Sequence, residues 1–363
     1  MTSEQHNVIA AVSQFEIAGE FLGAIPYGSG HINDSYCVVF LQAGVKVRYI
    51  VQRINQTIFK NPTALMENIQ RVTSHIAAKV SEDVGCSQQV LTLIPERYGR
   101  AWHIDGEGNY WRAFHFIDGA RTYDAVESVE QAFQAAKAFG QFQKLLVDLP
   151  EPRLHDTIPD FHHTPKRFKA LEQAIAIDVV DRAFVAKPEI EFALARQSIV
   201  NVLQDASLPE RITHNDTKFN NVMLDNTTGK GICVIDLDTV MPGLAPNDFG
   251  DMVRTTTSPA EEDERNLSKV TMQFSMFEAL VRGYITSADF LTKAEKQHLV
   301  LSSKLITFEQ GIRFLTDYLS GDAYYKVRYD DHNLDRCRTQ FKLVESIEQQ
   351  EERMNRLVQS VDP

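Results

Sequence analysis

Residues 213–221, Thr-His-Asn-Asp-Thr-Lys-Phe-Asn-Asn, form a polar loop inside a short strand-like region of an otherwise helical part of the chain. Apolar and β-branched residues at 212–213, 222–224 and 232–235 favour strands. Residues 225–229, Asp-Asn-Thr-Thr-Gly, favour a turn between the last two of these strands. The pattern predicts a β-hairpin with the polar loop at its entrance.

Three residues in and after this loop have the types and spacing that phosphoryl transfer requires. That chemistry needs a carboxylate near the acceptor hydroxyl and oxygen ligands for magnesium at the nucleotide phosphates. In kinase catalytic loops an asparagine follows the aspartate base by five residues, as Asn221 follows Asp216 here. Asp236 ends the next predicted strand, 20 residues after Asp216, and is expected to be the second metal ligand beside Asn221. The pattern therefore predicts a kinase site with Asp216 as its base.

Lys218 lies two residues after the predicted base. Its ammonium group is suited to stabilise the negative charge of a transferring phosphoryl group, so it is a candidate catalytic residue. A lysine in a loop is also often only a solvated surface charge. Both interpretations stay open at this stage.

The tripeptide Asp248-Phe249-Gly250 spells the magnesium-binding motif of protein kinases, but its position argues against that role. It lies 32 residues after Asp216, beyond residues 241–243, and opens a predicted helix. Asp236, at the end of a strand, is better placed to hold the metal. Asp248 is instead expected in the first turn of the helix, where its carboxylate can accept hydrogen bonds from the catalytic loop.

The distribution of strand and helix patterns predicts an α+β, bilobal fold. Strand patterns occupy the first third, together with one helix that begins at Asn61 and Pro62, a favourable cap and first residue. We expect a β-rich N-terminal lobe at residues 1–118 and a larger, mainly helical lobe at 119–363. The predicted strands are 35–40, 45–51, 90–94 and 110–116, and the later helices are 128–149, 189–203, 263–285, 293–318 and 334–361.

A glycine-containing loop before the strand at 35–40 is the candidate phosphate-covering loop. Glycine allows backbone N–H groups to approach anionic oxygens closely. Asn33 stands where a third glycine would complete the usual Gly-x-Gly-x-x-Gly pattern, so an ordinary β-turn is the competing interpretation. The candidate nucleotide-binding residues of this loop are Gly28, Ser29, Gly30 and Asn33.

The third strand offers Arg53 as the cation for the nucleotide phosphates, since no lysine stands in the usual place. Glu67 on the following helix is its candidate ion-pair partner, although both residues are also typical of a protein surface. Residues 113–119, which join the two lobes, are the expected adenine-binding hinge.

Composition excludes several other classes of protein. The 363 residues are 43% hydrophobic and 24% charged, as in ordinary globular proteins, and the net charge of −12 disfavours nucleic acid as a partner. The N-terminal sequence resembles no secretory signal, and no apolar run is long enough to span a membrane. The cysteines, Cys37, Cys86, Cys233 and Cys337, have no disulfide-framework or zinc spacing, which fits a cytoplasmic protein.

On these motifs the chain resembles the aminoglycoside phosphotransferase and choline kinase superfamily of protein-kinase-like enzymes. The resemblance implies use of ATP and Mg²⁺, with Asp216 as base and Asn221 and Asp236 as metal ligands. It also implies His31 and Arg313 as contacts to the acceptor. The shared stretches span nearly the whole chain, at residues 30–33, 213–221, 235–239, 311–315 and 332–334.

Within the superfamily, the chain is most similar to kinases that phosphorylate the anomeric hydroxyl of N-acetylglucosamine and N-acetylgalactosamine. It departs from them at Thr255, where they carry an aromatic residue, which predicts a roomier and more polar acceptor pocket. A hemiacetal hydroxyl is more acidic than an ordinary alcohol, so one aspartate base suffices to deprotonate it.

Other functions remain alternatives. The same chemistry can serve another sugar, an amino alcohol or an aminoglycoside. A second alternative is a nucleotide- or sugar-binding protein without catalysis. In either case the protein is expected to be a monomer or a homodimer. A metal-dependent hydrolase that uses His162 and His163 is a distant one, since no other residues at zinc spacing accompany them.

Overall fold

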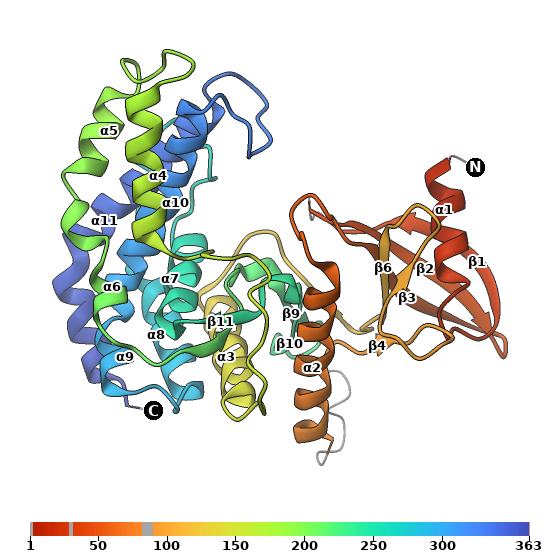
Figure 1. The fold of residues 1–363 in the computed structure, drawn as a ribbon. Coiled ribbons are helices and arrows are strands. Elements are labelled where there is room, and N and C mark those ends of the chain that lie inside the picture. The colour runs from red at the N-terminus through yellow and green to blue at the C-terminus, as the bar shows by residue number, and fades with distance from the viewer. Residues whose placement is uncertain (1–2, 29–31, 82–89, 363) are drawn as a thin grey trace.

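The computed structural model describes residues 3–28, 32–81 and 90–362 (Figure 1). The strands are β1 (Glu20–Pro26), β2 (Asp34–Gln42), β3 (Val45–Arg53), β4 (Leu93–Ile94), β5 (His103–Ile104), β6 (Tyr110–His115), β7 (Ala120–Arg121), β8 (Arg211–Thr213), β9 (Val222–Asp225), β10 (Gly231–Val234) and β11 (Met241–Gly243). The α-helices are α1 (Ser3–Val12), α2 (Pro62–Val80), α3 (Val129–Leu146), α4 (Thr164–Ile177), α5 (Lys187–Leu194), α6 (Val202–Asp205), α7 (Ala245–Thr256), α8 (Phe274–Ser287), α9 (Lys293–Gln297), α10 (Leu299–Leu319) and α11 (His332–Ser360).

An antiparallel sheet with the strand order β1-β2-β3-β6-β4 dominates the N-terminal part, and β5 pairs with β6 at its edge. The helix α1 lies against one face of this sheet (Figure 1). Val8 and Val12 of α1 belong to one buried cluster with Val38, Val51 and Trp111 of the sheet. Because successive residues of a strand face opposite sides, the neighbours of these residues along each strand face away from α1.

The helix α2 begins where the sequence predicts. The Asn61 side chain accepts a hydrogen bond from the Ala64 N–H (3.1 Å), and Pro62 occupies the first turn. Its apolar stripe does not pack in the cluster beneath α1. It joins the main core together with α3, α7 and α8, so that α2 lies between the sheet and the helical part (Figure 1). The buried stripe consists of Leu65, Ile69, Val72 and Ile76.

The C-terminal part is a bundle of helices around two small antiparallel sheets. The helix α3 packs on α8, and α10 packs on both α7 and α11. One small sheet has the order β10-β9-β7, and the other pairs β11 with β8. This arrangement confirms the predicted α+β class with a β-rich N-terminal lobe and a larger helical C-terminal lobe. We propose that the chain passes between the lobes at residues 116–119, between β6 of the large sheet and β7 of the small one.

Three sequence predictions of regular structure were wrong in detail. The predicted helix at 189–203 is interrupted after Leu194, where Arg196 donates to the Phe192 carbonyl and pairs with Glu348 on α11. The predicted helix at 263–285 begins only at α8, because Asn266 caps a separate short turn. Of the strand predicted at 90–94, only β4 forms.

Two further differences concern helices. The helix α4 was not predicted, although its first turn carries a proline. The predicted helix at 293–318 is divided at His298 into α9 and α10. No helix in residues 3–28, 32–81 and 90–362 has both the length and the apolar character needed to cross a membrane.

Candidate active site

The loop at residues 214–221 follows β8 and is fixed mainly by the carboxylate of Asp248. The backbone N–H of His214 donates to Asp248 Oδ2 (2.8 Å), and that of Asn215 donates to Oδ1 (2.7 Å). Gln143 of α3 donates to Oδ2 as well (2.6 Å). The prediction that Asp248 begins a helix and holds the loop is thus confirmed. Because Asp248 is fully buried and both of its oxygens accept bonds from the protein, its carboxylate serves the loop, which argues against a role as metal ligand.

Asn215, directly before the predicted base, has a left-handed backbone conformation (φ 65°). An asparagine tolerates this region better than most residues, because its short side chain can bond locally. Its amide group donates to the carbonyl of Thr239 (2.9 Å) and accepts from the Thr213 hydroxyl (3.1 Å). The conformation that turns Asp216 out of the buried loop is therefore held by several bonds at once.

His214 connects the loop to the strand that carries the second acidic residue. Its Nε2 lies 2.9 Å from the carbonyl of Ile235, which can only accept, so Nε2 carries a proton. Its Nδ1 accepts the backbone N–H of Asp216 (3.3 Å). By contacting the Asp216 N–H and the Ile235 carbonyl at once, the neutral tautomer of His214 fixes the spacing between Asp216 and Asp236.

The Asp216 carboxylate receives bonds from two predicted site residues. Lys218 Nζ lies 2.9 Å from Oδ1, and Asn221 Nδ2 lies 3.2 Å from Oδ2. Burial raises the pKa of Asp216, but the positive charge and the hydrogen bond of Lys218 lead the effects that outweigh it and leave the pKa below its usual value. Asp216 is therefore ionised at neutral pH and able to accept a hydrogen bond from a hydroxyl group.

Asp236 has the properties of a carboxylate that is suited to bind a cation. Within the described part of the chain no group donates a hydrogen bond to it, and its backbone is left-handed (φ 59°). Desolvation and the negative charges of Asp238 and Asp216 raise its pKa to about 6. A divalent cation would remove this repulsion.

Asn221 completes an oxygen set that fits magnesium. Its Nδ2 donates to the Asp216 carbonyl (2.8 Å) and carboxylate, so the amide oxygen is the group left for another partner. An amide oxygen and a carboxylate are ligands that Mg²⁺ prefers, with waters and phosphate oxygens for the remaining positions. The two predicted metal ligands therefore fit the ion that the sequence implies.

A buried ion pair, which the sequence analysis missed, joins the N-terminal sheet to this site. Arg112 on β6 makes a two-pronged contact with Asp238, its Nη2 lying 3.1 Å from Oδ2, and Gln52 on β3 accepts from Arg112 Nε (2.9 Å). The side chains of Arg112 and Asp238 are only 2% and 4% exposed. Asn33, from the candidate phosphate loop, also donates to Asp238 Oδ2 (2.6 Å). An arginine within the apolar strand pattern 110–115 was the available signal, since buried charges need partners.

Loss of this ion pair is expected to destabilise the protein strongly. Arg112→Met leaves Asp238 buried without its cation, which should cost about 3–5 kcal/mol of unfolding free energy. Arg53→Met, on the adjacent strand, removes an exposed pair with Asp34 and should cost about 0–1 kcal/mol. Urea denaturation of both variants measures the difference. Equal midpoints for Arg112→Met and the wild type would contradict the assignment.

The other predicted nucleotide contacts are placed differently. Arg53 bonds to Asp34 (2.6 Å) and, by strand alternation, leaves the sheet on the face opposite Gln52 and Arg112. Glu67 bonds to His155 (2.8 Å) and does not pair with Arg53. Gly28, near the start of the β1–β2 connection, has the positive φ (85°) that favours glycine. Ser29, Gly30 and His31, like Cys86, lie outside the described residues.

The predicted acceptor contact Arg313 lies on α10, near the catalytic loop. Its guanidinium stands 5.3 Å from the ring centre of Phe161, and that ring packs on His162, which contacts Asn215. Arg313 also contacts Gln310 (3.2 Å). Thr255, the departure noted in the sequence, bonds to the backbone of its own helix α7 (2.9 Å).

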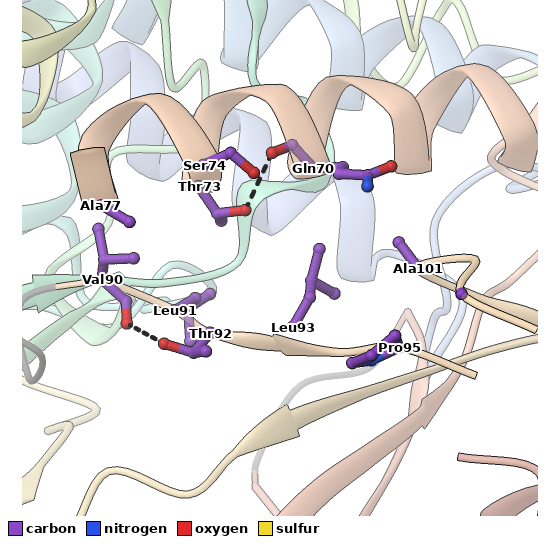
Figure 2. Close-up of a pocket in the computed structure, with 11 residues that line it drawn as sticks. Gln70, Thr73, Ser74, Ala77, Val90, Leu91, Thr92, Leu93, Pro95 and Ala101 are labelled. Atoms are coloured by element: carbon purple, nitrogen blue, oxygen red, sulfur yellow. Dashed lines mark hydrogen bonds between the residues drawn. The ribbon is translucent and has the colours of Figure 1, made fainter. Parts of the chain in front are cut away.

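A cavity lies in the N-terminal part of the protein (Figure 2). Gln70 and Thr73 of α2 form one wall, and residues 90–93 with Pro95 form another (Figure 2). No residue of the catalytic loop, nor Asp236, lines it. The cavity therefore adds nothing to the assignment of the site.

Comparison with known proteins relates this fold to small-molecule kinases. A microcompartment-associated aminopropanol kinase is 15% identical, with a TM-score of 0.66, over 96% of this chain and 98% of that one. An aminoglycoside phosphotransferase from Alicyclobacillus acidocaldarius is 12% identical, with a TM-score of 0.60, over 97% and 96%. A choline kinase from Cryptosporidium parvum Iowa II is 13% identical, with a TM-score of 0.54, over 95% of both chains. At these identities the likeness concerns the fold.

The family model described as the phosphotransferase enzyme family matches residues 23–270, which include the candidate phosphate loop, the catalytic loop and Asp236. With this match over most of the chain, on top of the site geometry, the protein belongs to the phosphotransferase enzyme family.

Proposed function

We propose that this protein is an ATP- and Mg²⁺-dependent sugar kinase that phosphorylates the anomeric hydroxyl of an N-acetylhexosamine, as N-acetylhexosamine 1-kinases do. The observation that carries the kinase assignment is the convergence of Asp216, Asn221 and Asp236 at one end of β8, β9 and β10. The solved structures of similar fold include kinases of small hydroxyl compounds, which supports a small-molecule acceptor.

In this proposal Asp216 orients the acceptor hydroxyl and accepts its proton. Its lowered pKa keeps it ionised and able to accept that proton, while phosphoryl transfer relies mainly on positioning and charge stabilisation. Lys218, 2.9 Å from Asp216, holds the carboxylate and offers positive charge toward the transferred group. The magnesium ion, held by Asn221 and Asp236, would neutralise phosphate charge.

The charges around Arg313 support a neutral sugar over a cationic acceptor. Among the described residues, Arg313 and Arg167 have no carboxylate within ion-pair distance, and a buried Arg167 Nε has no hydrogen-bond partner. The nearby carboxylates already have cationic partners, namely Asp251 and Glu262 with Arg254, and Glu309 with His162. Among the described residues these carboxylates already have cations beside them, with Asp251 Oδ2 the one buried oxygen of the set that lacks a hydrogen-bond partner. Sugar hydroxyl and acetamido oxygens can accept from the two arginines.

A magnesium–ATP assay over a panel of acceptors tests this proposal. N-acetylglucosamine and N-acetylgalactosamine should release ADP at least about tenfold faster than choline, ethanolamine, aminopropanol or an aminoglycoside, a difference of about 1.4 kcal/mol in transition-state binding. Phosphorus NMR should locate the new phosphate on C1.

The methyl glycoside of N-acetylglucosamine is the matched control, because its anomeric oxygen is blocked. Phosphorylation of this glycoside would refute the assignment as a 1-kinase, but the protein would still be a kinase that acts on another hydroxyl. Faster turnover of an amino alcohol or aminoglycoside would instead identify the acceptor class. Nucleotide binding without ADP release from any acceptor would indicate a binding protein.

A further inference from the structure

His162 connects the catalytic loop to the helix α10 through both nitrogens of its ring. Its Nε2 lies 3.0 Å from the backbone carbonyl of Asn215, and its Nδ1 lies 2.9 Å from Glu309 Oε1. The second oxygen of Glu309 accepts from the Thr164 hydroxyl (2.7 Å). The side chains of His162 and Glu309 are 8% and 1% exposed. In the sequence, His162 stands out only as one half of the pair His162-His163.

The two partners of His162 require two donors. A backbone carbonyl has no proton to give, so Nε2 must donate to it. An ionised carboxylate likewise only accepts, so Nδ1 must donate to Glu309. An imidazole ring that donates from both nitrogens is an imidazolium. The geometry therefore describes a buried pair of opposite charges that holds the Asn215 carbonyl.

The surrounding charges agree with this protonation state. Burial lowers the pKa of His162, but the bond to and the negative charge of Glu309, with further help from Asp251, outweigh it and raise the pKa above its usual value. Burial raises the pKa of Glu309, but its bond to His162 and the charges of His162 and Arg313 lower it overall. The charged groups that face the pair are Asp248 and Asp251 from α7, Arg167 from α4, and Arg313 from α10.

We propose that His162, held by Glu309, is a positioning residue that fixes the peptide between Asn215 and Asp216 and so orients the catalytic carboxylate. The Asn215 N–H is already held by Asp248, so His162 supplies the restraint on the other polar group of this left-handed residue. A neutral imidazole has one N–H and cannot satisfy both partners. The restraint is then lost as pH rises through the pKa of His162. The consequence for catalysis rests on the proposed function, whereas the contact itself does not.

The first test follows the contact by NMR and does not depend on turnover. In the full-length protein, the backbone ¹⁵N shift of Asp216, whose peptide contains the Asn215 carbonyl, should titrate with the same midpoint as the His162 ring. In Glu309→Gln this midpoint should move to lower pH, because the carboxylate that raises the pKa is gone. In His162→Gln the Asp216 titration should disappear. An Asp216 shift that ignores the state of His162 would overturn the proposal, whatever the acceptor assay shows.

The second test measures the effect on rate. His162→Gln should lower kcat by about 10–100-fold while the KM for ATP stays within about twofold, because orientation is lost and nucleotide contacts are not. Glu309→Gln should move the alkaline fall of kcat to lower pH. His163→Gln is the matched control, since His163 only caps α4 through the Lys166 N–H (3.2 Å). Equal kcat and equal pH profiles for His162→Gln, Glu309→Gln and His163→Gln, with the NMR coupling present, would reject the positioning role.

Discussion

Replacing Asp216 by asparagine should reduce kcat by about 10²–10⁴-fold with the best acceptor, because the variant loses the group that accepts the hydroxyl proton. The structure adds a second reason. Lys218 and Asn221 both donate to this carboxylate, and an amide offers them only one acceptor oxygen. The amide NH₂ group then stands where one of the two oxygens accepted, and the bonds made to that oxygen are lost. The loss should appear in ADP release at saturating acceptor, with little change in the KM for ATP.

Asp289→Asn is a suitable control for this experiment. Asp289 carries the same charge and forms an exposed pair with Lys144 (2.7 Å), and no hydrogen bond or ion pair joins it to the described residues of the catalytic loop. Its replacement should leave both kcat and stability nearly unchanged. ADP release from Asp216→Asn within about twofold of the wild type would exclude Asp216 as the base and favour a binding protein.

The second large effect is expected at Asp248, which does not need to touch any substrate. Three donors meet its two oxygens: the His214 and Asn215 N–H groups and the Gln143 amide. In Asp248→Asn, whichever way the amide lies, its NH₂ group faces at least one buried donor. This should cost about 1–3 kcal/mol of stability. Because one of the affected donors is beside Asp216, kcat should fall by about 100-fold even when the protein is folded.

Chemical denaturation and single-temperature kinetics separate these two consequences. The midpoint of unfolding reports the lost hydrogen bonds, while kcat measured well below that midpoint reports the position of Asp216. Asp289→Asn again provides the baseline. An Asp248→Asn enzyme with wild-type kcat would show that the loop keeps its shape without this carboxylate. Asp248 would then have no role in positioning the loop.

Much of the fold was predictable because the responsible patterns are local. Asn61 and Pro62 begin α2, Ser128 begins α3, and the hairpin of β9 and β10 forms around the predicted turn. Helix ends were predicted less well where one side chain interrupts a periodic pattern. Arg196 is an example, because its contacts with the end of α5 and with Glu348 on α11 are not visible in the periodicity.

In the candidate site, too, the local features were predictable and the long-range contacts were not. The spacing from His214 to Asn221, and the acidic residue at the end of the next strand, follow from a short stretch of chain whose geometry the backbone fixes. The side of the sheet on which Arg53 lies could not be predicted, for a related reason. Arg53 and Gln52 are neighbours on one strand, so their side chains lie on opposite faces of the sheet. Only the packing of α1 shows which of the two faces is turned away from the site.

The sequence by itself predicted the loop at 213–221, its proposed base and its proposed metal ligands, because these residues lie within 21 positions of one another on adjoining elements. Only the tertiary structure decided what holds them. Arg112 meets Asp238 across 126 positions, Asn33 meets it across 205, and His162 meets Glu309 across 147. No periodicity relates residues so far apart. The packing of the helices and the sheet brings them together, and the cost of burying an unpaired charge then makes each of these contacts necessary.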